Sequence, residues 1–550
     1  MGIYLNPGNE GFKSAVRSKI YIDKTGMLEY TNSVLDTEQR YICVSRPRRF
    51  GKSIAAEMLV AYYDKSCDSK ELFQGRKIAE CEDFTEHLNQ YDVIHVDMNS
   101  LCHKRDRKTK QEISASEVVN LFHLVVIEEL RKVFPASVQE DDVDLPYVLA
   151  QINEDTGSKF VIIIDEWDAI FRENKNDEAA QKEYITLLRG LFKDAPSKKF
   201  LKLGYLTGIL PIKKYGTESA LNNFDEFTMI ESDMLAEYVG FTEEEVIALY
   251  EEYGMDFEEA KRWYDGYHLA KDLHIYNPKS VVDSVRRKKI GNYWTSTETY
   301  ESLKYYISMN FDGLKDAIIE MIAGGRCKVD TNTFENDMVS FQSKDDVLTV
   351  LIHLGYLAYD GETEEVTVPN EEVRAAFIRA IKKSNWNYVI EAIAASDQLL
   401  QATWRGDGKA VAEGIDKVHG SNTSILNYNN ENALSCVISL AYYNAINEYT
   451  IVRELPTGCK TSGGRLSCTD RSGTETGYAD VVFLPRKGSD KPAMVVELKW
   501  NQSAGGAIAQ IKEKQYVQAL SEYHGNMLLV GINYDKESKK HECVIEFCEQ

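Results

Sequence analysis

Residues 41–59 read YICVSRPRRFGKSIAAEML, and this stretch decides the fold of the N-terminal part of the chain. Its apolar, β-branched start predicts a buried strand, and its end predicts a helix that begins directly after Gly51-Lys52-Ser53. Such a turn lets backbone amides cradle phosphates, while the lysine reaches the β/γ-oxygens and the serine supplies a Mg²⁺ ligand. The spacing is that of a Walker A loop in which Arg46 stands where the first glycine is expected.

The loop is expected to be unusually cationic, because Arg48 and Arg49 follow Arg46 closely. ATP is the expected ligand, and the predicted contacts are Arg48, Arg49, Phe50, Gly51, Lys52 and Ser53. Taken alone, the motif has a second interpretation, a chance Gly-Lys-Ser in an ordinary strand-to-helix turn.

A second apolar run, FVIIIDEWD at residues 160–168, ends in an acidic pair. This pattern predicts a Walker B strand, in which Asp165 orients the Mg²⁺ shell and Glu166 polarises the attacking water. Thr207 ends the run LKLGYLTG and is expected to contact the nucleotide or that water, although a threonine at a strand end is more often a helix cap. The two motifs together favour a phosphoryl-transfer site.

The composition is that of a water-soluble, folded protein of several domains. The chain has 550 residues, 43% of them hydrophobic and 27% charged, with a mean hydropathy of -0.38, which excludes disordered and membrane-embedded classes. A net charge of -23 excludes a general nucleic-acid coat but leaves room for a local basic cleft. No signal pattern or long apolar run is evident, so a cytoplasmic protein without a membrane partner is expected. The ten cysteines form no CxxC pair and are expected to be reduced thiols.

Three tracts differ in pattern along the chain. Residues 1–235 alternate apolar runs with helical periodicity, which predicts an α/β layer with a mainly parallel sheet. Residues 236–425 are expected to be mostly helical, with a capped helix starting at Thr242 and a winged-helix-like hairpin near 360. Residues 426–550 predict a helix, three strands, a further helix and two last strands, with a long polar loop at 457–477.

Seven motifs in order resemble the bacterial AAA-ATPase-like family of P-loop ATPases over roughly residues 1–290. These are YIDKTGML (21–28), SRPRRFGKS (45–53), IIIDEWD (162–168), LTGIL (206–210), SALNNFDEFT (219–228), WYDGYHL (263–269) and IYNPKSV (275–281). An arginine at the first-glycine position is usual in that family. The resemblance implies a P-loop NTPase fold that binds ATP and Mg²⁺; its arginine finger is not assignable, and it leaves room for a homo-oligomer.

The C-terminal tract carries a second group of charged residues, Asp480 in GYADVVFLP and Glu497 and Lys499 in MVVELKW. Residues two apart in a strand face one side, so Glu497 and Lys499 are expected to project together, with Asp480 brought alongside by a hairpin. Two carboxylates hold Mg²⁺ and a lysine stabilises an attacking hydroxide, which is the layout of a phosphodiesterase. An exposed, salt-bridged strand is an equally good interpretation of these three residues alone.

The order of elements resembles the PD-(D/E)XK nuclease superfamily, an α/β restriction-endonuclease-like fold often fused behind AAA-ATPase-like domains. The resemblance implies that Asp480, Glu497 and Lys499 form an active site, that Glu431 assists metal binding, and that Gln510 belongs to the following helix motif. The long 457–477 loop departs from that family.

The favoured interpretation is an ATP-binding, ATP-hydrolysing protein that regulates a Mg²⁺-dependent nuclease acting on DNA or RNA, in a setting such as defence against foreign nucleic acid. A nucleotide-switched signalling or scaffold protein, whose nuclease-like domain binds without cleaving, is the alternative. An ATPase that acts only as a remodeller is a third interpretation.

Overall fold

A computed structural model describes most of the chain, and its packing forms two compact units. The described residues are 2–105, 111–212, 214–215, 218–219, 221–270, 273–295, 300–335, 338–339, 341–384, 386–422, 431–456, 459–462, 465–468, 478–486, 489–513, 520, 523 and 526–548. The first unit comprises Met1–Thr299 and Lys328–Ala375, and the second Tyr300–Cys327 and Ala376–Gln550. The domain boundaries expected at 235 and 425 stay predictions, because packing divides residues 236–425 between the two units.

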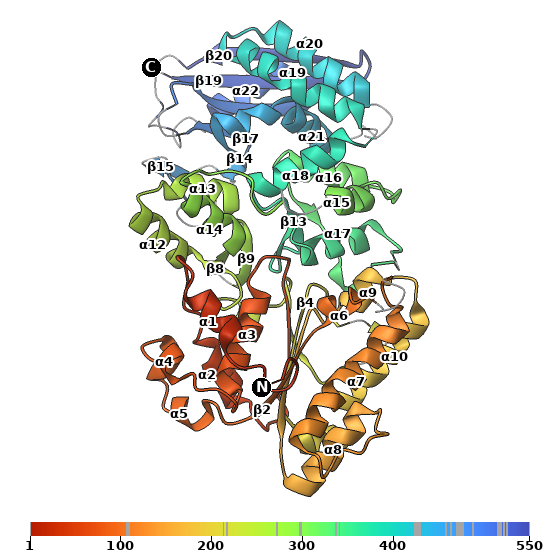
Figure 1. The fold of residues 1–550 in the computed structure, drawn as a ribbon. Coiled ribbons are helices and arrows are strands. Elements are labelled where there is room, and N and C mark those ends of the chain that lie inside the picture. The colour runs from red at the N-terminus through yellow and green to blue at the C-terminus, as the bar shows by residue number, and fades with distance from the viewer. Residues whose placement is uncertain are drawn as a thin grey trace. The chain divides into compact units, whose positions relative to one another are not determined.

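A five-stranded, all-parallel sheet forms the base of the first unit (Figure 1). Its order is β2-β3-β4-β1-β7, and its strands are β1 (Tyr41–Ser45), β2 (Asp92–Asp97), β3 (Phe160–Asp165), β4 (Leu201–Gly208) and β7 (Asp225–Phe227). All residues of β1 and β3 are buried, as expected for a parallel sheet covered on both faces. The predicted α/β layer is therefore confirmed, and it resembles the fold of P-loop ATPases.

Helices cover both faces of this sheet. Figure 1 shows α1 (Glu10–Val16), α2 (Met27–Ser33) and α3 (Lys52–Tyr63) on one face, and α7 (Ala115–Val133), α8 (Leu145–Thr156) and α10 (Glu178–Phe192) on the other. The apolar faces of α7, α8 and α10 pack on the sheet in one continuous core. Shorter elements complete the layer: α4 (Lys70–Phe73), η1 (Lys77–Glu80), α5 (Phe84–His87), α6 (Met98–Cys102), α9 (Ala169–Glu173), α11 (Ser197–Phe200), β5 (Lys214–Tyr215) and β6 (Glu218–Ser219).

The rest of the first unit contains small sheets as well as helices, so the expectation of a mostly helical tract was incomplete. The sheet β8-β10-β9 consists of β8 (Phe241–Thr242), β9 (Tyr267–Ala270) and β10 (Leu273–Tyr276). It follows η2 (Asp233–Leu235) in the chain and packs with α12 (Glu243–Tyr253), α13 (Phe257–Tyr264) and α14 (Pro278–Arg287). Thr242 and Glu245 form the predicted capping box of α12. The expected hairpin is present as β12 (Ala358–Asp360) and β13 (Glu365–Thr367), after η3 (Thr331–Thr333) and α17 (Lys344–His353).

The second unit is built on a five-stranded mixed sheet of order β14-β17-β18-β19-β20. Its strands are β14 (Tyr449–Pro456), β17 (Tyr478–Pro485), β18 (Ala493–Trp500), β19 (Met527–Asp535) and β20 (Lys540–Phe547). Only β18 and β19 pair in parallel, and α22 (Ala504–Glu513) lies between them in the chain and packs against both. The predicted strands of this tract are thus all present.

The remaining elements of the second unit are helical except for one hairpin. The helices are α15 (Tyr300–Ile307), α16 (Leu314–Ile322), α19 (Asn387–Trp404), α20 (Gly408–Asn422), α21 (Glu431–Ala441) and η4 (Tyr443–Asn447). The tract 457–477 was predicted as a loop, but β15 (Cys459–Ser462) pairs there with β16 (Arg465–Cys468). Two elements, β11 (Cys327–Lys328) and α18 (Glu371–Lys382), begin in one unit and end in the other. Within the described part of the chain, no helix combines the length and apolar character needed to cross a membrane.

Candidate nucleotide and metal sites

The predicted phosphate-binding loop connects β1 to α3 at the edge of the parallel sheet. Arg49 and Gly51 both adopt left-handed backbone conformations, with φ of 70° and 98°, which turn the chain sharply before the helix. Phe50, between them, is fully buried and packs edge-on against Tyr267 with ring centroids 5.5 Å apart. The Phe50 side chain therefore anchors the loop, and because Phe50 also lines the cleft beside it, the ligand contact predicted for this residue stays a prediction.

Lys52 lies across its own loop. Its ammonium donates to the carbonyl oxygens of Arg46 and Pro47 at 3.0 and 3.1 Å, and it lies 3.7 Å from a carboxylate oxygen of Glu166. The residue is only 4% exposed. The structure thus places the lysine between the loop and the acidic pair, as the Walker A prediction requires.

Arg46 does not present its positive charge to a ligand in the loop, contrary to expectation. It is fully buried, and its Nη1 donates to the carbonyl oxygens of Ser45, Phe227 and Thr228 at 3.0, 2.9 and 2.8 Å. Burial lowers the pKa of Arg46 to about 10. The side chain ties the end of β1 to the end of β7, and the exposed cations of the loop are Arg48 and Arg49.

The acidic pair lies at the carboxyl end of β3, beside the loop. Asp165 is buried and accepts hydrogen bonds from the Thr207 hydroxyl and, at 2.9 Å, from the Glu166 amide. Thr207 ends neighbouring strand β4, so its role here is to hold the Asp165 carboxylate rather than to cap a helix. Ser53, in the first turn of α3, lines the same cleft as Asp165. A hydroxyl and a carboxylate in one cleft fit the oxygen ligands that Mg²⁺ prefers.

Glu166 is held in a strained position between two cations. Its φ of 51° is unusual for a residue with a side chain, and it forms ion pairs with Lys52 and Arg172. Burial raises the pKa of Glu166, although both cations act against that rise. A carboxylate poised in this way suits a general base.

Asp168 and Arg172 belong to this network and were not identified from the sequence. Arg172 lies 3.1 Å from Asp168, whose other contacts are the amides of Ile209 and Leu210 at 3.0 and 2.9 Å. Burial alone would lower the pKa of Arg172, but Asp168 and Glu166 outweigh it and raise that pKa. The i, i+4 spacing of an aspartate and an arginine just after the acidic pair was the available signal.

A cleft of about 1260 Å³ joins these groups. Besides the loop and the acidic pair, it is lined by the segment after α1 and by α14, neither of which was predicted to contribute. The charged lining residues from these elements are Lys19, Lys24, Lys279, Asp283 and Arg286. Lys279 pairs with Asp283 at 3.0 Å. The volume and the mixture of cationic and apolar walls suit a nucleotide.

The second unit brings together the residues predicted for the C-terminal cluster. Asp480 on β17 lies one residue beyond the antiparallel pair Val481–Val496, so it faces Glu497 on β18, and it accepts the Leu498 amide at 2.6 Å. Lys499 donates to Glu497 Oε1 at 3.0 Å, and the Gln510 amide donates to the same oxygen. The hairpin therefore aligns the two carboxylates and the lysine as predicted.

Glu497 has the features of an incomplete cation site. It is 1% exposed, and its second oxygen, Oε2, is buried without a hydrogen-bond partner among the described residues. Burial, followed by the nearby charge of Asp480, raises the pKa of Glu497 to about 7, although Lys499 opposes the rise. A buried carboxylate oxygen without a donor is a fitting ligand for Mg²⁺. The side chain of Glu431, the other predicted metal ligand, lies outside the described residues.

Comparisons with known proteins bear on the N-terminal part. Residues 10–217 match a family model described as predicted AAA-ATPase. An uncharacterized protein from the vnfD 5′ region of Azotobacter chroococcum mcd 1 is 24% identical over 284 residues, 51% of each chain. The chain thus spans about half the length of this curated relative.

Two solved structures align over most of their own length. The ORC2 protein of Aeropyrum pernix, in ADPNP and ADP complexes, is 11% identical with a TM-score of 0.25 and covers 67% of this chain and 98% of its own. Cdc6p of Pyrobaculum aerophilum is 8% identical with a TM-score of 0.21 and covers 68% and 98%. The family match covers residues 10–217, and the loop geometry agrees with it, so both support an AAA-ATPase-like, nucleotide-binding domain in the N-terminal region.

Proposed function

We propose that the chain hydrolyses ATP in its N-terminal cleft and that this hydrolysis regulates a Mg²⁺-dependent cleavage of DNA or RNA by its C-terminal sheet. The observation that carries the nuclease part is Oε2 of Glu497, which is buried beside Asp480 and has no hydrogen-bond partner in the part of the chain that the structure describes. The ATPase part rests on the phosphate loop, the acidic pair and the family match.

In the N-terminal cleft, Ser53 and Asp165 would hold Mg²⁺, which neutralises phosphate charge when bound. Lys52 is already desolvated and would exchange its contacts with loop carbonyls for phosphate oxygens. Glu166 would orient and deprotonate the attacking water, because its raised pKa makes it a better base than an exposed glutamate. Thr207 keeps the Asp165 carboxylate in place.

In the C-terminal sheet, Asp480 and Glu497 would hold Mg²⁺, whose chemistry there is to activate water and neutralise the phosphodiester. Lys499 already touches Glu497 and would stabilise the charge that develops on phosphorus. The order of a helix, three antiparallel strands, a helix and a parallel returning strand supports the resemblance to PD-(D/E)XK nucleases. Nucleic acid is the proposed partner because a phosphodiester is the substrate this charge arrangement suits, and a homo-oligomer stays a prediction.

The test uses the full chain and measures ATP turnover together with Mg²⁺-dependent cleavage of single- and double-stranded DNA and RNA, with and without ATP. The variants are Lys52→Ala and Lys499→Met, with Lys491→Met as the matched control. The Lys491 ammonium pairs with the adjacent Asp490 at 3.0 Å and lies 5.0 Å from the centroid of the Trp404 ring, and both partners are outside the Asp480–Glu497 cluster. We expect Lys499→Met to abolish cleavage but keep ATP turnover, Lys52→Ala to abolish turnover and alter cleavage, and Lys491→Met to behave as wild type.

Cleavage that survives Lys499→Met would overturn the assignment of the C-terminal site. ATP turnover without cleavage of any substrate would favour the alternative, a nucleotide-switched scaffold whose C-terminal unit binds without cutting. Absence of ATP binding by the wild-type chain would overturn the whole proposal.

A further inference from the structure

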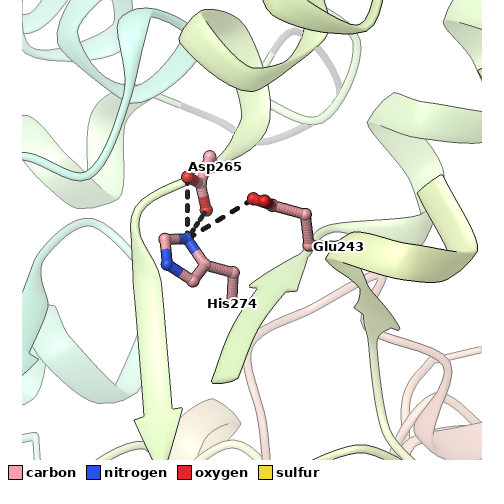
Figure 2. A group of neighbouring side chains, drawn as sticks. All are labelled: Glu243, Asp265 and His274. Atoms are coloured by element: carbon pink, nitrogen blue, oxygen red, sulfur yellow. Dashed lines mark hydrogen bonds and ion pairs between the residues drawn. The ribbon is translucent and has the colours of Figure 1, made fainter. Parts of the chain in front are cut away.

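A cluster of three metal-ligating side chains lies in the first unit, outside both sites described above. Glu243 is the first residue of α12, Asp265 follows α13, and His274 lies on β10. Figure 2 shows the imidazole Nδ1 of His274 directed at both carboxylates. The distances from Nδ1 are 2.9 Å to each oxygen of Asp265 and 3.7 Å to Glu243 Oε2.

More carboxylate oxygens surround His274 Nδ1 than one hydrogen bond needs. A single ring N–H donates to one acceptor well, yet three carboxylate oxygens lie within 3.7 Å of Nδ1. Asp265 is 9% exposed, and His274 is the donor that faces its carboxylate within the described part of the chain. A nearly buried carboxylate with one donor has unused acceptor capacity, which a cation would satisfy.

The spacing suits a small divalent ion. Two ligands about 2.0–2.1 Å from a tetrahedral Zn²⁺ lie about 3.4 Å apart, and the separations of 2.9 and 3.7 Å bracket that value. Imidazole nitrogen and carboxylate oxygen are both ligands that Zn²⁺ takes in proteins, and three protein ligands leave a fourth tetrahedral position for water. The ring of His268 lies edge-on to His274 with centroids 4.2 Å apart, which brings a second imidazole to the edge of the cluster.

Two neighbouring side chains donate hydrogen bonds to the Glu243 carboxylate and favour its ionised form. Lys261 donates to it at 2.9 Å and Tyr276 at 3.0 Å. Burial would raise the pKa of Glu243, but these two hydrogen bonds outweigh it and lower that pKa. The Lys261 ammonium is 38% exposed, so it can rotate toward water when a metal ion takes its place.

We propose that Glu243, Asp265 and His274 bind a divalent ion of the zinc type, which ties α12, the end of α13 and β10 together. The proposed metal site is close in the chain to residues that line the nucleotide cleft. Phe241 precedes Glu243 by two residues and lines the nucleotide cleft, and α14, which also lines it, directly follows β10. A metal ion at the cluster would fix this wall of the cleft.

The test is titration of the full chain, without nucleotide, with Zn²⁺ alone, followed by calorimetry and by counting bound zinc after dialysis. We expect His274→Gln and Asp265→Asn each to bind one zinc fewer than wild type. His87→Gln is the matched control and should bind as wild type does. His87 also lies near a carboxylate, 4.0 Å from Asp83, but among the described residues no third metal-ligating side chain completes a group there. Thermal melts without zinc verify that each variant folds.

Lys261→Met separates a metal site from a plain network of ion pairs and leaves all three ligands intact. Loss of a competing positive charge should tighten zinc binding by about fivefold or more. An ion-pair network that binds no metal predicts no change in zinc binding and only a lower melting temperature. Equal numbers of bound zinc in wild type, His274→Gln and Asp265→Asn would overturn the proposal, as would unchanged or weaker zinc binding by Lys261→Met.

Discussion

Replacing Arg46 by glycine completes the Walker A consensus on paper, yet we expect it to destabilise the first unit by about 4 kcal/mol. Nη1 of Arg46 carries two hydrogens shared among three carbonyl oxygens, and hydrogen bonds from a charged donor contribute about 1.5–3 kcal/mol each, or roughly 3–6 in total. The fall in pKa to about 10 corresponds to a burial cost of ~3 kcal/mol for the charged form. The remainder is about 0–3 kcal/mol.

Two further losses bring the change to that value. Three buried methylenes of the arginine stem contribute roughly 2 kcal/mol by area, and a glycine in this ordered loop costs about 1 kcal/mol of backbone entropy. Arg48→Gly is the matched control, because the same loop loses an exposed arginine and only the glycine cost of ~1 kcal/mol applies.

The assay is urea unfolding, with the two units followed separately because a chain of two compact units need not unfold in one step. Trp167 is buried beside the loop-bearing sheet, and tryptophan fluorescence reports the first unit once Trp386, Trp404 and Trp500 of the second unit are replaced by Phe in every variant compared. A free energy of unfolding for Arg46→Gly within ~0.5 kcal/mol of that for Arg48→Gly would refute the reasoning. So would tighter ATP binding by Arg46→Gly, because it would mean that the arginine obstructs the loop instead of bracing it.

Three other predictions follow from the same contacts. Glu166→Gln should retain ATP binding but lower the rate of hydrolysis by about 10²–10⁴-fold in single-turnover assays, and an unchanged rate would exclude Glu166 as the base. Arg172→Met leaves the buried carboxylate of Asp168 and the half-buried carboxylate of Glu166 without their shared cation, so it should lower the free energy of unfolding by about 3–5 kcal/mol in urea, with stability equal to wild type as the contradicting result. Because burial raises the pKa of Glu497 to about 7, Mg²⁺ must displace a proton below that pH, and its affinity should fall about tenfold per pH unit in calorimetry. The stability of the folded state without Mg²⁺ has the opposite pH dependence: the raised pKa favours the protonated carboxyl, so this group stabilises the fold at low pH and that contribution is lost as pH rises through about 7. A Mg²⁺ affinity that does not depend on pH and that Glu497→Gln leaves unchanged would contradict the first statement, and an unfolding free energy without this loss would contradict the second.

Local patterns predicted those parts of the sites that lie within one strand, loop or helix. The sequence 41–59 places a strand, a loop and a helix in immediate succession, so the position of Lys52 follows from chain connectivity alone. The alternation of Glu497 and Lys499 likewise follows from strand geometry. The hairpin β15–β16 had a local signal as well, because Gly463-Gly464 separates two short polar strands, but the polar composition favoured a loop.

Partners that meet only through tertiary packing left no such pattern. In the sequence, Arg46 is typical of a phosphate contact. It is buried because β7 pairs with β1 and places the Phe227 carbonyl where the guanidinium can donate a hydrogen bond to it. Glu243, Asp265 and His274 are spaced by 22 and 9 residues, which is no recognised ligand motif. They meet because β10 pairs with both β8 and β9.

The two acidic sites differ in what they lack, and this difference argues for different ligands. Both oxygens of Glu166 already face cations, Lys52 on one side and Arg172 on the other, and the exposed arginines of the loop add positive charge. The N-terminal cleft therefore has cationic donors available to an incoming anion, as a nucleotide phosphate requires. Glu497 accepts a hydrogen bond from one lysine, Lys499, through Oε1. Its other oxygen, Oε2, is buried beside Asp480 and has no hydrogen-bond partner among the described residues. The two carboxylates and one lysine of that cluster carry an excess of negative charge that is buried from water, so the ligand expected there is a cation.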